Sequence, residues 1–233
     1  MRYVTPAGPA ELGSRDGLAY SLWLPEGAPE AGLVVLHGAG SCKERHHDFA
    51  RAARATGFAA VCFDQRGHGA SEGALDARLL DDVATVAGLL GDVPLALRGS
   101  SMGGYVAILA AERIGAGAVV AICPASAEGL WRGLRGDRVG FRADEPALEA
   151  FLAEHPLAEA VERSQVPLLL LHAEGDERVP VAHSRELARR SPAAATKLVV
   201  VPGGHHRSVQ HDAELQGMAL RWLRRTLRPG DQG

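Results

Sequence analysis

The residue types best suited to chemistry begin with a serine set between glycines. Residues 99–103 read Gly-Ser-Ser-Met-Gly and match the pattern G-x-S-x-G, with Ser101 at its centre. Ser100 does not fit the pattern, because Arg98 and Met102 flank it. A serine hydroxyl is a poor nucleophile unless a histidine takes its proton and an acid orients that histidine. Nucleophilic catalysis at Ser101 therefore requires both partners elsewhere in the chain.

An acid and two histidines follow Ser101, in the order serine, acid, histidine. Asp176 comes directly after one apolar run, and His205 and His206 come after the next. Catalytic groups in parallel sheets gather at the carboxyl ends of the strands, so we expect these side chains to meet there. The residues alone leave either histidine open as the base, and helix capping is the alternative role for Asp176.

A second glycine-flanked loop lies upstream, at His37-Gly38-Ala39-Gly40. An acyl-transfer enzyme needs two N–H donors aimed at the oxyanion of its tetrahedral intermediate. We expect the backbone amides of Ala39 and Met102 to be these donors. We expect His37 to orient the loop by hydrogen bonding.

The elements that must position these residues alternate along the chain. Continuous apolar runs are typical of strands covered on both faces, and they predict a mostly parallel sheet. These runs span residues 32–37, 58–64, 94–98, 118–123, 167–173 and 197–202, and helices are predicted over 46–56, 75–90, 104–113, 181–190 and 212–227. The alternating segment 18–25 is expected to open the sheet as an antiparallel strand. The fold class is therefore α/β, a three-layer α/β/α arrangement.

We expect residues 1–233 to form a single domain, with a small helical insertion at 125–165 over the active site. That segment is longer than one crossover helix needs, and it carries Trp131 and Phe141. We expect these two aromatic residues to bind substrate, and packing of the insertion onto the core is the alternative. A small insertion predicts an open pocket for short or medium acyl chains.

Several motifs together resemble the α/β-hydrolase family, from about residue 18 to 227. The resemblance rests on LHGAG (36–40), DQRGHGAS (64–71), GSSMGG (99–104), HAEGDERVP (172–180) and VPGGHHRS (201–208). It implies an α/β-hydrolase fold with a small lid, and it places the catalytic base at His206 and leaves His205 in the variable position before it. Ala173 departs from the family pattern, where glycine is common.

The expected function is a serine hydrolase, carboxylesterase-like, that cleaves carboxylic ester or related acyl bonds through an acyl-enzyme on Ser101. Asp176 and His206 complete the expected triad, and a small-molecule acyl substrate is the expected partner. The alternatives are a serine peptidase, acyltransferase or perhydrolase of the same fold, or a ligand receptor with little turnover. No cofactor and no metal are expected, because adjacent residues such as His46 and His47 point in different directions on a helix.

The bulk composition argues against several other classes. A net charge of -3 and a pI near 6.4 give no basic surface for nucleic acid. No apolar run is long enough for a signal peptide or a membrane span, and three cysteines leave at least one unpaired, as in a reducing compartment. We therefore expect a cytoplasmic protein that binds neither nucleic acid nor membrane. The oligomeric state stays open, with a homodimer as one alternative.

Overall fold

The computed structural model describes residues 8–136 and 140–228. The ends of the expected domain at 1–233 and three positions of the expected insertion therefore lie outside the described residues. The strands are β1 (Glu11–Arg15), β2 (Leu18–Trp23), β3 (Ala31–Leu36), β4 (Phe58–Phe63), β5 (Leu95–Ser100), β6 (Ala118–Ile122), β7 (Leu168–Ala173) and β8 (Lys197–Val201). The helices are η1 (Lys43–His46), α1 (His47–Ala55), α2 (Leu79–Ala87), η2 (Gly88–Leu90), α3 (Met102–Ala110), α4 (Ala127–Arg135), α5 (Glu145–Glu154), α6 (Leu157–Arg163), α7 (Val181–Arg190) and α8 (Ala213–Leu227).

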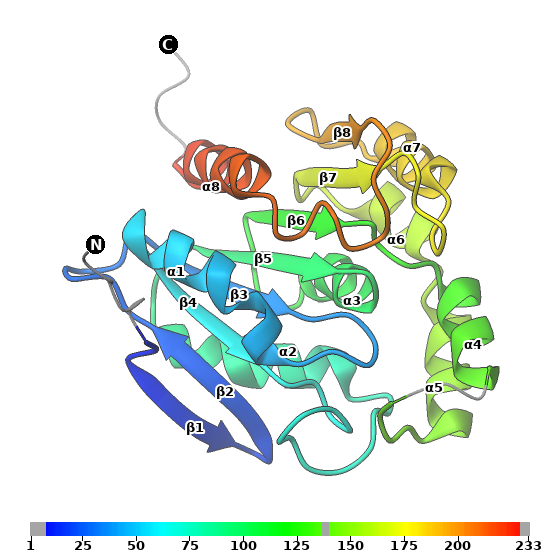
Figure 1. Ribbon diagram of the computed structural model, residues 1–233, viewed down its shortest axis with the longest axis horizontal. Helices are drawn as coiled ribbons and strands as arrows, with labels where there is room; N and C mark the ends of the chain where they lie inside the picture. Colours follow the sequence, from blue (N-terminus) through cyan, green and yellow to red (C-terminus); the bar gives the residue numbers. More distant parts are fainter. Residues whose placement is uncertain (1–7, 137–139, 229–233) are drawn as a thin grey trace, which may run out of the picture.

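The strands form one sheet in the order β1-β2-β4-β3-β5-β6-β7-β8 (Figure 1). Strands β1 and β2 pair antiparallel, β2 pairs antiparallel with β4, and every pairing from β4 to β8 is parallel. The chain runs from β3 outward to β4 and then returns to the other side of β3 with β5. Sheets of this kind bind their ligands at the carboxyl ends of the strands, beside such a reversal.

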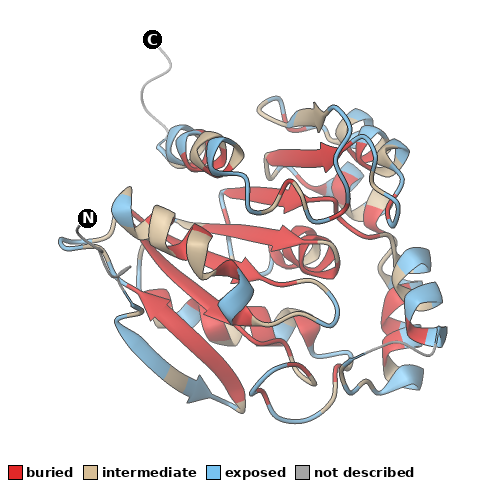
Figure 2. Ribbon diagram, viewed as in Figure 1, coloured by how far each residue is buried: buried red, intermediate tan, exposed pale blue. Residues whose placement is uncertain are grey.

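Alternate residues of the central strands enter the two apolar cores on opposite faces of the sheet. In β3, Leu33 and Val35 belong to the core that includes residues of α1 and α8. Val34 and Leu36 belong to the core that includes residues of α2 and α3. Both sets are buried because helices cover both faces, as Figure 2 shows for the central strands. The α/β/α layering predicted from the continuous apolar runs is confirmed.

Two predicted boundaries differ from the structure. The segment 18–25 contains β2, which pairs antiparallel as predicted but does not open the sheet. The edge strand is β1, which comes earlier in the chain and is largely exposed. The helix predicted from residue 75 begins at Leu79. Leu75 is buried and forms an isolated bridge with Ala143, so its apolar side chain fills the core from a loop.

Between β6 and β7 the described residues form helices α4, α5 and α6. Ser126 caps α4 and Asp144 caps α5, each accepting a hydrogen bond from a first-turn amide. Helix α6 packs against α3 and α7 and so belongs to the outer layer. Helices α4 and α5 lie beyond the carboxyl ends of β5 to β7 (Figure 1). Within residues 8–136 and 140–228, none of the helices has the length and apolarity that crossing a bilayer requires.

Candidate active site

Ser101 occupies a strained turn between β5 and α3. Its φ of 54° and ψ of -116° lie in a region that residues with side chains rarely adopt. A Cβ added to Gly99 would meet the Gly103 carbonyl oxygen at 2.0 Å, and a Cβ on Gly103 would meet the Leu36 carbonyl oxygen at 2.4 Å. The Ser101 amide donates to the Ile122 carbonyl at 2.9 Å. The turn therefore needs both glycines, and it holds the serine at the carboxyl end of β5.

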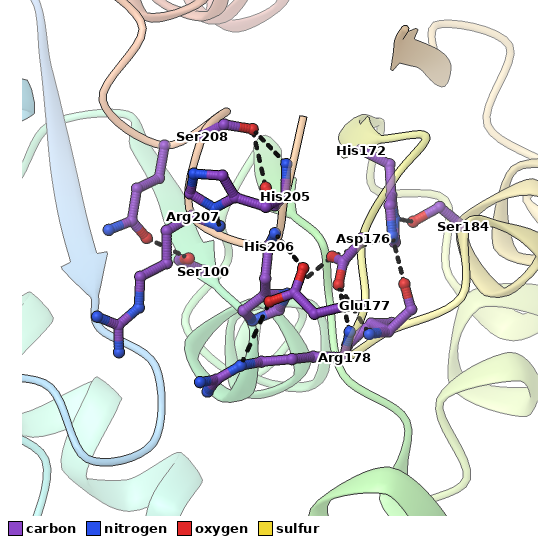
Figure 3. Close-up of polar contacts among 12 residues, drawn as sticks. Ser100, His172, Asp176, Glu177, Arg178, Ser184, His205, His206, Arg207 and Ser208 are labelled. Carbon is purple, nitrogen blue, oxygen red and sulfur yellow. Dashed lines mark hydrogen bonds and ion pairs between the residues drawn. The ribbon is translucent and has the colours of Figure 1, made fainter. Parts of the chain in front are cut away.

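An acid and a histidine meet beside this edge of the sheet. His206 Nδ1 lies 2.7 Å from Asp176 Oδ2 (Figure 3). The other carboxylate oxygen of Asp176 accepts hydrogen bonds from the amides of Arg178 at 2.8 Å and Val179 at 2.9 Å. The β7 loop thus fixes Asp176 by its own backbone, and Asp176 in turn fixes the imidazole.

The ionisation of Asp176 sets the tautomer of His206. Burial alone would raise the pKa of Asp176, but hydrogen bonds from His172 and His206 and from the two loop amides outweigh it and hold the pKa well below its usual value. An ionised carboxylate only accepts hydrogen bonds, so Nδ1 of His206 carries the ring proton and donates a hydrogen bond to Asp176. Nε2 is left with a free lone pair, as a general base requires.

The structure brings His206, and not His205, to Asp176. His205 is exposed, and its Nδ1 accepts from the Arg207 amide at 3.3 Å. The His205 amide donates to Ser208 Oγ at 3.0 Å, so this residue serves the loop's own turn. The two histidines that the residue pattern leaves open are thereby separated by their contacts (Figure 3).

Within the described residues, no hydrogen bond joins Ser101 to His206. Both lie on loops at the carboxyl edge of the sheet, after β5 and β8. Hydrogen bonds between a nucleophile and its base are often loose without substrate and tighten in the Michaelis complex. The relative position of these two loops therefore controls how closely His206 approaches Ser101.

The loop after β3 lies against the nucleophile turn. A Cβ added to Gly38 would meet the Ser100 carbonyl oxygen and Ser101 Cβ, each at 3.2 Å. The Gly40 amide donates to His68 Nε2 at 3.1 Å and is not available to an oxyanion. The exposed amide of Ala39 has no acceptor in the described part of the chain, and Met102 is the first residue of α3, where a helix leaves its N–H groups unpaired.

Two histidines hold this loop. His37 is fully buried, and its Nε2 accepts from the Gln65 amide at 3.0 Å while its Nδ1 donates to the Gly38 carbonyl at 2.8 Å. Burial, reinforced by the neighbouring His68, lowers the pKa of His37 to about 4. His37 is therefore neutral at physiological pH and acts through its hydrogen bonds. The ring of His68 stacks on Phe141 with centroids 4.0 Å apart, which ties the loop to the segment between β6 and β7.

A cavity of about 1060 Å³ opens at Ser101. Its walls are mainly apolar and come from α2, α3 and the segment between β6 and β7. Side chains of this apolar part include Leu75, Leu79, Met102, Tyr105, Val106, Leu134, Phe141, Leu148 and Leu152. Phe141 thus lies where the sequence predicted a substrate contact. Trp131 does not line the cavity, because its ring packs on the core and lies under the Arg135 guanidinium at 4.8 Å.

A cysteine completes the surroundings of the acid and the histidine. The ligand atoms of Cys123, Asp176 and His206 all lie within 4.8 Å of one another. Burial raises the pKa of Cys123 to about 12. Asp176 Oδ2 and His206 Nδ1 already bond each other at 2.7 Å, an arrangement that suits a proton-handling pair.

Sequence reasoning missed two residues of this region. His172 is the penultimate residue of β7, and its Nε2 lies 3.4 Å from Asp176 Oδ2. Both side chains are fully buried. Arg98, two residues before Ser100 in β5, is also fully buried. In the sequence His172 is one residue of an apolar run and nothing sets it apart. The one sign of Arg98 in the sequence is that it is a charged residue within an apolar run.

Comparisons with known proteins find relatives along most of the chain. Residues 27–133 match a protein family described as serine aminopeptidase, S33, and residues 151–232 match one described as TAP-like protein. The monoglyceride lipase of Mus musculus is 37% identical over 101 residues, which is 39% of this chain and 33% of that relative. The chain thus matches about a third of the length of that relative.

Two longer matches cover most of the chain. The monoacylglycerol lipase of Mycolicibacterium smegmatis is 24% identical over 81% of this chain and 85% of its own length. The crystal structure of a monoacylglycerol lipase from Paleococcus ferrophilus has a TM-score of 0.70 and 21% identity, over 90% of this chain and 99% of that one. At this identity the structural likeness establishes the fold.

Proposed function

The chain belongs to the α/β-hydrolase family, and we propose that it is a serine hydrolase that cleaves carboxylic esters through an acyl-enzyme on Ser101. One observation carries the proposal. Ser101 stands in a strained turn on the wall of an apolar cavity, and Asp176 orients His206 on the loops beside that turn.

The proposed reaction has two halves, and in each half His206 acts first as a base and then as an acid. Nε2 of His206 takes the proton of Ser101 as Oγ attacks the ester carbonyl, and Asp176 stabilises the imidazolium through Nδ1. The amides of Ala39 and Met102 bind the oxyanion. His206 then gives the proton to the leaving alcohol oxygen as the C–O bond breaks. A water molecule, deprotonated by Nε2 of His206, then attacks the acyl-enzyme carbonyl. The imidazolium gives that proton to Ser101 Oγ as the acyl–Oγ bond breaks, and the carboxylic acid leaves.

The proposed substrate is a single-chain acyl ester, with a monoacylglycerol as the leading candidate. The apolar lining of the cavity offers hydrophobic surface to an acyl chain, and relatives of this chain are monoacylglycerol lipases. Helices α4 and α5 contribute Leu134, Leu148 and Leu152 to the cavity, so we assign them the role of a small lid that sets chain-length preference. Short and medium chains fit this open arrangement best.

Peptide hydrolysis is the second candidate, favoured by the match of residues 27–133 to a serine aminopeptidase family. An aminopeptidase must bind a free α-amino group, for which an unpaired carboxylate is the usual partner. The carboxylate of Glu128 lines the cavity but already pairs with Arg132 at 2.5 Å. Among the described lining residues Glu128 is the single acid, whereas Arg132, Arg178 and Arg207 are basic, so the cavity favours an ester over a substrate with a free amino group.

A substrate panel tests the proposal. Purified protein is assayed with p-nitrophenyl esters of increasing chain length, with monoacylglycerols and with alanine p-nitroanilide. We expect ester hydrolysis, with Ser101→Ala reducing kcat by roughly 10⁴-fold or more. Ser191→Ala is the matched control. Ser191 bonds Thr196 at 2.8 Å in the connection from α7 to β8, at the amino end of β8 and away from the carboxyl ends where the site lies. Full activity in Ser101→Ala, or faster cleavage of the anilide than of every ester, would contradict the proposal.

A further inference from the structure

The residue before the nucleophile reaches the loop of the base directly. Ser100 Oγ donates a hydrogen bond of 2.8 Å to the side-chain oxygen of Gln210, four residues after His206. Ser100 is only 4% exposed. One side-chain contact therefore spans 110 positions of sequence and joins the two loops whose separation sets the approach of His206 to Ser101.

The same strand makes a second contact with Gln210. Side chains alternate along a strand, so Arg98 and Ser100 point to the same face of β5. Arg98 Nη2 donates to the Gln210 carbonyl at 3.0 Å, and its other terminal nitrogen bonds His46 Nδ1. The guanidinium also lies 4.8 Å from the centre of the Phe49 ring.

Because Arg98 is buried, loss of these contacts would cost free energy. Arg98 is fully buried, and no carboxylate in the described residues bonds it. A buried charge without an ion pair is costly unless neutral acceptors and an aromatic face satisfy it. The buried Nε of Arg98 has no partner among the described residues, and the Gln210 carbonyl is one of two acceptors that the terminal nitrogens have. A shift of this loop would therefore leave the buried cation with a single acceptor.

We propose that Arg98 and Ser100 are positioning residues that lock the loop of the base against the nucleophile turn through Gln210. We call this set of three residues the Gln210 clasp. The inference rests on the proposed function, because it assigns the clasp to the geometry between Ser101 and His206. The clasp does not contact the substrate and acts through the two loops. It therefore controls the alignment of the Ser101 hydroxyl with His206 Nε2 and does not affect substrate binding.

Ser100→Ala and Gln210→Met remove the side-chain contact from either end. A misplacement of about 1 Å can cost about 10²-fold in rate, and we expect kcat to fall about 10- to 100-fold in both variants. KM should change by less than about threefold, because the cavity walls are untouched. The rate at which a fluorophosphonate labels Ser101 should fall by the same factor as kcat, since labelling needs the base but not the substrate pocket.

Two variants separate positioning from general destabilisation. Gln210→Glu keeps a side-chain oxygen that can accept from the Ser100 hydroxyl. Its kcat should therefore stay close to the wild-type value, well above that of Gln210→Met. Ser191→Ala removes a hydrogen bond of equal length far from the site and should lower Tm comparably with little change in kcat. The double variant Ser100→Ala with Gln210→Met should lose no more than either single variant, because one shared contact is removed in each.

The outcomes distinguish the two proposals. If Ser101→Ala abolishes hydrolysis while Ser100→Ala and Gln210→Met keep wild-type kcat and labelling rates, the clasp is refuted and the proposed function stands. Additive losses in the double variant, or a kcat loss in Ser191→Ala of the same size, would also refute it. If Ser101→Ala retains activity, the proposed function itself fails.

Discussion

Replacing Asp176 with asparagine tests the assignment of the base through a single atom. The asparagine oxygen still accepts from the amides of Arg178 and Val179, so the loop keeps its shape. The new NH₂ group, however, faces His206 Nδ1 across the present 2.7 Å contact. Nδ1 must then accept, and the ring proton moves to Nε2. An imidazole protonated at Nε2 and neutral overall has no lone pair for the Ser101 proton.

The expected loss follows from that tautomer. Asp176→Asn should lower kcat about 10⁴-fold, as the same exchange does in serine proteases, and this corresponds to about 5 kcal/mol of transition-state stabilisation. KM should stay near the wild-type value, because Asp176 does not line the cavity. Steady-state kinetics with a short p-nitrophenyl ester measures both constants, and circular dichroism checks the fold.

The variant also carries a pH signature. The pKa of Asp176 is lowered by folding, so its carboxylate stabilises the native state above its ordinary value of 3.8, and this stability is lost as pH falls below that value. Urea unfolding should therefore show a gap between wild type and Asp176→Asn near neutral pH that narrows in acid. A variant that keeps a tenth or more of the wild-type kcat, or a gap that widens in acid, would refute the role given to Asp176.

Three further substitutions probe the nucleophile turn, the cavity and the ion pair between η1 and the loop after β4. Gly103→Ala should lower the free energy of unfolding by about 2 to 4 kcal/mol, measured by urea denaturation, because its Cβ would meet the Leu36 carbonyl at 2.4 Å. Phe141→Ala should raise KM about 10-fold for octanoyl but less for acetyl esters, because it removes part of the apolar cavity wall. Lys43→Met should destabilise the protein by about 3 kcal/mol in thermal unfolding, because Asp64 would keep a buried carboxylate without its 2.8 Å ion pair.

The central sheet could be predicted because burial on both faces leaves a clear record in the chain. Strands β3 to β8 are continuous apolar runs, and their order of appearance follows the alternation of an α/β domain. β1 left no such record, because Glu11–Arg15 is an exposed edge strand with little apolar surface. Leu75 has the spacing of a helical core residue although it lies in the loop before α2. Periodicity alone does not distinguish a buried loop residue from a helical one.

The candidate site divides in the same way. Ser101, Asp176 and His206 lie in turns whose glycines and polar residues stand out between apolar runs. The residues alone leave His205 and His206 open, and the family resemblance favours His206. The coordinates agree with the resemblance, because His206 contacts Asp176 while His205 bonds within its own loop. Contacts between distant segments, such as that of Ser100 with Gln210, leave no local pattern at either end.

The identity of the acylated residue tests the central claim most directly. Purified protein is treated with a fluorophosphonate, digested and analysed by mass spectrometry, with and without prior incubation with a monoacylglycerol. The account predicts a single adduct on Ser101 that substrate protects against and that Asp176→Asn forms far more slowly. An adduct on any other residue, or none on Ser101 in protein that hydrolyses esters, would contradict it.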